Sequence, residues 1–218
     1  MVGNLGAVCW HLADYPAALD YSQWSLRLAE EQLDLSGQAI SSHNVALILD
    51  RLGRSAEGLD RHRQVLAITQ QLGDRVGESR ARSSLGGALV RDNRGEEARP
   101  LLLEALRMAR EAESRVAECE ALSPLAGLNS RAGRQLEALA TYREALGMAV
   151  EGGRPDTVVE IGVDLGACLV RAGQAAEAVT VLRSALAGAR ELQDRHHEVR
   201  AVAELAEAIR LSSAHKDS

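Results

Sequence analysis

Aromatic residues are scarce in this sequence: its 218 residues include no Phe, three Tyr and two Trp. Sandwiches and barrels draw heavily on aromatic and β-branched residues, so this shortage argues against an all-β fold. Ala is abundant instead, with 36 copies, and together with Leu, Glu and Arg it favours helices that approach closely over small side chains. The composition therefore predicts an all-α protein.

Lysine and cysteine are also rare. Lys216 is the only lysine, against 24 arginines, which excludes a Walker-type phosphate-binding loop because that loop needs a lysine after its glycines. The three cysteines are odd in number and widely spaced, so no disulfide framework is expected. No apolar run reaches the roughly 20 residues of a membrane span, and no secretory signal pattern occurs. We therefore expect a cytoplasmic protein without membrane contact.

One internal repeat, with a period of 40 residues, organises the chain. An aliphatic residue recurs at that spacing and is followed each time by Gly or Ala: Leu5-Gly6, Val45-Ala46, Leu85-Gly86, Leu125-Ala126, Leu165-Gly166 and Leu205-Ala206. A second small residue follows thirteen positions after the first five of these aliphatic residues: Ala18, Gly58, Ala98, Ala138 and Ala178. Six registers without an insertion or deletion indicate repeated structural units.

Each unit reads as two helices, A and B, separated by a short break such as Gly53-Arg54-Ser55. We expect one array over residues 1–211, a capping helix at 196–212 and a flexible tail at 213–218. The predicted repeats are 1–34, 35–74, 75–114, 115–154 and 155–194. The first copy is short before its Leu, so we expect the chain to be part of a larger protein.

The pattern resembles the tetratricopeptide repeat (TPR), whose signature has Leu-Gly in helix A, then Ala, then Ala-Leu in helix B. The last pair appears here as Ala105-Leu106, Ala145-Leu146 and Ala185-Leu186. The aromatic landmarks of the family are mostly aliphatic, and its closing Pro is absent, which suits 40-residue repeats like those of kinesin light chain and LGN-type adaptors. HEAT and armadillo repeats share the period but not this order, and rank second. The resemblance implies a right-handed α-solenoid of about five repeats plus the cap.

In TPR arrays, helices A build a concave wall that binds a partner segment, so the resemblance also implies a groove. Mapped onto this chain, the residues we expect to contact a protein or peptide are Asn4, Trp10, His11, His43, Asn44, Leu47, Arg51, Arg80, Ser84, Arg91, Arg131 and Arg171. Asn can both donate to and accept from a peptide backbone. The position five after each aliphatic residue holds Trp10, Asp50, Val90, Ser130 and Val170. Small residues such as Ser83, Gly87 and Ser130 predict a roomy groove.

A cation recurs six residues after each aliphatic residue: His11, Arg51, Arg91, Arg131 and Arg171. One interpretation is structural, because a cation in the last turn of a helix complements the helix dipole by about 0.3–1 kcal/mol. The other is a basic spine that binds an acidic partner or a small anion through the planar guanidinium. Both stay open at this point.

Catalytic and metal-binding motifs are not found. The six His residues are scattered, and His196-His197-Glu198 lacks a second ligand set, so we predict neither enzyme activity, nor a cofactor, nor a metal. A net charge of −6 argues against direct contact with nucleic acid. The favoured function is an interaction scaffold, as the sensor or partner-binding part of a larger bacterial transcriptional regulator. The alternatives are a sensor of a small anion or peptide pheromone, and a homodimerisation module using Leu5, Leu12 and Leu19.

Overall fold

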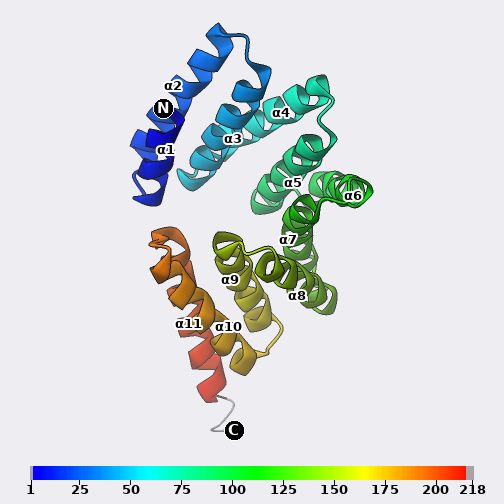
Figure 1. Cartoon of the computed structure of the whole chain (residues 1–218). Helices are drawn as coiled ribbons and strands as arrows, with labels where there is room; N and C mark the ends of the chain where they lie inside the picture. Colours follow the sequence, from blue (N-terminus) through cyan, green and yellow to red (C-terminus); the bar gives the residue numbers. More distant parts are fainter. Residues whose placement is uncertain (1, 215–218) are drawn as a thin grey trace. The chain divides into compact units, whose positions relative to one another are not determined.

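The computed structural model describes residues 2–214, and it places the side chains of residues 5–10 and 12–213. This part of the chain is helical and contains no strand, so the predicted all-α class is confirmed (Figure 1). The helices are α1 (Val2–His11), α2 (Tyr15–Glu31), α3 (Leu35–Arg51), α4 (Ser55–Leu72), α5 (Arg75–Arg91), α6 (Gly95–Glu111), α7 (Arg115–Arg131), α8 (Gln135–Glu151), α9 (Pro155–Arg171), α10 (Ala175–Glu191) and α11 (Arg195–Ala214). None of them is long and apolar enough, over the described residues, to cross a membrane.

The turns between helices recur regularly: one residue with positive φ occurs every 20 residues. Five of these residues are Gly53, Gly73, Gly133, Gly153 and Gly173, and five are Ala13, Leu33, Asn93, Glu113 and Gln193. Each turn closes with the two bonds of a Schellman motif, as where Ala13 donates to the Trp10 carbonyl and Asp14 to the Cys9 carbonyl. The breaks within a repeat and between repeats are therefore the same turn.

The two small-residue registers lie where the helices of a pair cross. Ala18, Ala46, Ala98, Ala126, Ala138 and Ala178 are all 0% exposed. A Cβ on Gly86 of α5 would lie 2.5 Å from Cδ2 of Leu102 in α6, so only glycine allows that approach. The closest helix contacts therefore occur where the sequence repeats its small residues.

The helices group into two compact units, Met1–Ala121 and Leu122–Ser218, with the boundary inside α7. In the first unit Ala18, Leu19, Val45, Ile48 and Leu49 form one cluster of the core. In the second unit α11 packs against α9 and α10, where Ala201 meets Val163 and Ala185. Each unit is thus a stack of helices in which sequence neighbours are neighbours in space.

Candidate functional site

The predicted site residues lie on the A helices, and their exposure differs. Asn44, Arg91, Arg131, Arg171 and Arg80 are exposed, whereas Trp10, Leu47, Arg51, Ser84 and His43 are partly buried. Asn4 and His11 fall outside the described side chains. Asn44, Leu47 and Arg51 are spaced three and four residues apart, so they share one face of α3. We call these three side chains the α3 row.

The arginine column mainly connects consecutive A helices. In each described pair, an Arg contacts the residue 41 positions earlier in the chain. That residue stands five positions after the repeated aliphatic residue of the preceding repeat. Arg51 Cζ lies 5.4 Å from the Trp10 ring centroid, a cation–π contact. Arg91 Nη2 lies 2.6 Å from Asp50 Oδ2. Arg171 donates to Ser130 Oγ at 3.0 and 3.1 Å.

Arg131 differs from the other described arginines of the column. The residue 41 positions earlier is Val90, whose side chain cannot accept a hydrogen bond. The Arg131 guanidinium is exposed and forms no hydrogen bond or ion pair within the described part of the chain. Of the described members of the column, Arg131 is thus uncommitted, whereas Arg91 and Arg171 contact side chains of the preceding repeat.

A polar cluster around the buried His62 joins α3, α4 and α5 in the first unit. His62 of α4 is 1% exposed, and its Nε2 lies 3.2 Å from Asp50 Oδ2, the same oxygen that receives Arg91. The rings of His43 and His62 meet edge to face with centroids 6.3 Å apart. Neither Asp50 nor His62 was among the predicted site residues.

The cluster sets the charge states around it. Burial, together with the nearby charges of His62 and Arg80, lowers the pKa of His43 to about 4. Burial raises the pKa of Asp50, but the bond to His62 and the charge of Arg91 outweigh it and hold that pKa below its usual range. At neutral pH His43 is therefore uncharged and Asp50 is a carboxylate, so His43 contributes no positive charge to the face.

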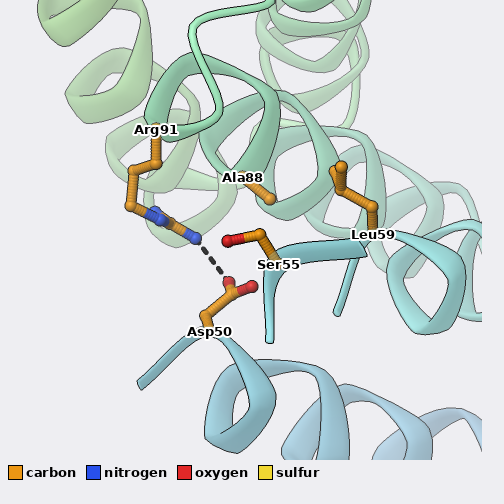
Figure 2. A pocket seen from close by; sticks show the side chains of 5 residues that line it. All are labelled: Asp50, Ser55, Leu59, Ala88 and Arg91. Atoms are coloured by element: carbon orange, nitrogen blue, oxygen red, sulfur yellow. Dashed lines mark hydrogen bonds and ion pairs between the residues drawn. The ribbon is translucent and has the colours of Figure 1, made fainter. Parts of the chain in front are cut away.

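A small cavity opens between α3, α4 and α5 beside the Arg91–Asp50 pair (Figure 2). It is lined by Asp50, Ser55, Leu59, Ala88 and Arg91, and its volume is about 80 Å³. Sites for drug-sized molecules usually measure about 300–1,000 Å³. The cavity can hold a few waters but not a metabolite of ordinary size.

Arg80, another predicted site residue, joins α5 to α7 together with Ser83. We call the contacts of Arg80 and Ser83 with Glu120 the clamp. Arg80 Nε lies 2.8 Å from Glu120 Oε2, while Ser83 Oγ, one turn further along α5, donates to the Glu120 carbonyl. Pro124, four residues after Glu120, has no N–H to give that carbonyl its helical bond. Ser83 is 3% exposed, so it belongs to the contact between helices and does not line an open groove. The predicted roomy groove is therefore wrong at this position.

The second unit has an equivalent network around Ser130, which is 2% exposed. Its hydroxyl oxygen accepts hydrogen bonds from the Arg171 guanidinium, and the hydroxyl donates to Gln135 Oε1 at 3.1 Å. Arg200 of α11 contacts Asp164 of α9 at 2.5 Å. Here too the small polar side chains of the A helices are used for packing.

Comparison with known proteins agrees with this architecture. A family model described as a tetratricopeptide repeat matches residues 37–111, which span α3 to α6. Residues 37–111 of the chain thus match the TPR family. The predicted family and its helical solenoid fold are thereby confirmed, while no curated protein matches the sequence.

Several solved structures have a similar fold. A Rap protein complexed with Competence and Sporulation Factor has a TM-score of 0.79 at 17% identity, over 99% of this chain and 64% of that protein. The Rap conjugation gene regulator of plasmid pLS20, in complex with the Phr* peptide, has a TM-score of 0.78 at 14% identity, over 98% and 62%. A thermophilic TPR protein of Thermus thermophilus reaches 0.68 at 21% identity, over 94% and 97%. The TPR chain thus spans slightly less than two thirds of the two Rap proteins.

The sequence contains a signal for some of the residues that contact the predicted site residues. Asp50 and Ser130 stand at the register that precedes each column arginine by 41 residues, so the partner of each Arg can be read from the 40-residue period. His62 carries no such signal, because its meeting with Asp50 depends on how α4 crosses α3. Glu120 is likewise revealed only by the packing of α5 on the start of α7.

Proposed function

We propose that this chain is a non-enzymatic module that binds a peptide or protein segment through the α3 row. The observation that carries the proposal is the row itself: an exposed carboxamide, an aliphatic side chain and a guanidinium on one helix face. Arg51 is oriented by Trp10, and the cluster of Asp50, His62 and Arg91 holds the helices beneath. Preorganised side chains bind with a smaller entropic cost.

The chemistry of the row favours a particular type of segment. Asn44 suits the backbone of an extended peptide, Leu47 an apolar side chain, and Arg51 a carboxylate. Two structurally similar Rap proteins have been solved as complexes, one of them with a peptide. One of them is a gene regulator, which supports a role for this chain as the partner-binding part of a larger, cytoplasmic bacterial regulator.

The test uses peptides selected from a random 12-residue library on the full chain. Asn44→Ala and Arg51→Glu should each weaken the selected peptides by about tenfold or more, because each removes one recognition group. Arg63→Glu on α4, whose side chain is 48% exposed, is the matched charge reversal and should leave binding unchanged. Equal binding to wild type and Arg51→Glu would place the site elsewhere.

Binding of a small anion has less support from the geometry. Arg91 and Arg171 already contact Asp50 and Ser130, and the cavity beside Arg91 also presents the Asp50 carboxylate. An anion would have to displace those contacts and approach a negative charge, which costs free energy.

Homodimerisation has one specific observation in its favour, at α1. Leu5, Val8 and Leu12 are 47%, 54% and 70% exposed, although Val45 and Ile48, at the registers of Leu5 and Val8, are almost fully buried. Leu19, which was also expected to be exposed, is only 7% exposed and belongs to the core, because α1 and α3 cover it. Sedimentation of the wild type and of Val8→Glu tests this alternative, since a dimer through α1 must dissociate in the variant.

A further inference from the structure

The last described helix leaves an apolar face uncovered. Val199, Val202 and Ile209 of α11 are 69%, 46% and 43% exposed, and Ala206 between them is exposed as well. Their spacing of three, four and three residues places them on one face of the helix. The opposite face, with Ala201 and Ala208 both 0% exposed, packs in the second unit. We call the four uncovered residues the α11 stripe.

The repeat shows what covers this face elsewhere. Forty residues earlier, α9 carries Val159, Gly162, Gly166 and Leu169 at the same registers, and all four are buried. Their cover is α10: a Cβ on Gly162 would lie 3.2 Å from Ala185 Cβ, and one on Gly188 would lie 2.8 Å from Val159 Cγ2. In the first unit, α6 covers the same face of α5, where Ser79 Oγ donates to the Ala105 carbonyl at 2.7 Å. The α11 stripe therefore continues an interface that earlier repeats fill with a B helix.

A second regularity specifies the chemistry of the missing helix. Where helix A has Gly86 or Gly166, the B residue sixteen positions later is Leu102 or Leu182, and its branched end occupies the space of the absent Cβ. Gly6 of α1 is the exception, because the residue sixteen positions later is Ser22, whose Oγ would lie 3.1 Å from an added Cβ. Where helix A has Ala46 or Ala126, the residue sixteen positions later is His62 or Tyr142, which are 1% and 3% exposed. A flat ring leaves room for a methyl group that a branched leucine would overlap. Ala206 belongs to the alanine class.

We infer that the α11 stripe docks an amphipathic α-helix of a partner, and that this helix presents a planar His or Tyr side chain to Ala206. Three residues after the ring, a small residue faces Val202, as Ala185 faces Gly162 in α9 and α10. Leu122 of α7 occupies the repeat position of Val202, two repeats earlier in the chain. The helix that follows it, α8, has a ring at Tyr142 and a small residue three positions later, at Ala145. The α8 sequence is therefore the best internal template for the partner. The α11 stripe shares no residue with the α3 row, and the inference does not depend on the proposed function.

The probe is a dye-labelled peptide with the sequence of residues 134–152, titrated with the full chain and followed by fluorescence polarisation. Val202→Glu and Ile209→Glu should each weaken binding by about tenfold or more, because each places a charge inside an apolar contact. Leu136→Glu is the control, since Leu136 is 82% exposed on α8 and lies outside the stripe. Unchanged binding in Val202→Glu, or no binding at millimolar protein, would overturn the proposal.

The size matching has its own test. A peptide of residues 174–192 carries Leu182 in place of the ring and should bind the wild type more weakly than the Tyr142 peptide. Ala206→Gly, with its helix content checked by circular dichroism, should raise affinity for the Leu182 peptide about fivefold relative to the Tyr142 peptide. If Ala206→Gly changed the affinity for both peptides equally, the inference that a planar side chain contacts Ala206 would be wrong. If the chain alone sediments as a dimer and Val202→Glu makes it monomeric, a second copy covers the stripe and the proposal is wrong.

Discussion

The contacts of Arg51, Arg91 and Arg171 depend on which residue stands 41 positions earlier in the chain. Arg51, Arg91 and Arg171 occupy one register, yet they meet an indole ring, a carboxylate and a hydroxyl. Arg91 and Arg171 are themselves exposed, so each of these contacts contributes little free energy, but together they determine which residues meet across consecutive A helices. A repeated residue type therefore does not imply a repeated role.

His43 gives a pH-dependent prediction. Its pKa is about 4 in the fold and about 6.5 when unfolded, so the stability gained from the neutral imidazole is present above pH 6.5 and is lost as the pH falls towards 4. Of the groups around it, His62 and Arg80 add to the lowering, while Glu120 and Asp50 oppose it. The free energy of unfolding should differ between pH 7 and pH 5, and His43→Gln should reduce that difference by about 2 kcal/mol. Urea unfolding at both pH values measures this, and an unchanged difference would contradict the neutral, buried state.

Ser83 gives a prediction about the clamp on α7. Ser83→Ala leaves the Glu120 carbonyl without its hydroxyl donor and should cost about 1–2 kcal/mol, whereas Ser84→Ala, at the next position, should change stability by less than about 0.5 kcal/mol. Pro124→Ala restores an N–H to the same carbonyl. In that background the cost of Ser83→Ala should fall by about half or more, which a double-mutant cycle of urea unfolding measures. Full additivity would mean that the proline is unrelated to the serine.

At the scale of helices and turns, the 20-residue recurrence of left-handed residues governs the architecture. Gly fills five of the ten turns, and Ala13, Leu33, Asn93, Glu113 and Gln193 fill the others although a Cβ is strained at positive φ. The Schellman bonds hold these residues in place. The turn is therefore imposed by helix packing as much as by glycine.

Leu33 tests this view of the turns. Its φ is 55° and its side chain is 85% exposed, so Leu33→Gly loses little packing and relieves backbone strain. The variant should be about 1 kcal/mol more stable. Gly73→Ala, at φ 66°, is the reverse change in an equivalent turn and should cost about the same amount. Thermal unfolding of both variants checks the sign, and destabilisation by Leu33→Gly would refute the strain argument.

At the scale of the whole molecule, the main contacts among the described residues of each unit link helices that are adjacent or one apart in sequence, as in other solenoid proteins. Stability should therefore respond locally to the loss of an element. Removal of residues 195–218 uncovers the surfaces of α9 and α10 on which Ala201 packs.

Hydrogen exchange tests this locality. In the shortened chain, amide protection in α9 and α10 should fall by about tenfold or more, while α3 and α4 keep theirs. The full chain with Val202→Glu is the control, because it alters α11 without uncovering α10. An equal loss of protection in α3 would show that the molecule unfolds as one cooperative body.

The sequence alone determined the period, the helix pairs, the small-residue crossings and the family, because each depends on residue type at a fixed spacing. It also placed the site residues on the A helices. Only the tertiary structure decided which of them remain available: Arg91 and Arg171 are engaged by the preceding repeat, His43 is neutral, and Ser83 and Ser130 are buried. Residues at the same position of the repeat can differ in exposure: Val199 is exposed, whereas Val159, 40 residues earlier, is buried. The deciding factor is the neighbouring helix, because burial and pairing depend on what lies opposite a side chain as well as on its own type.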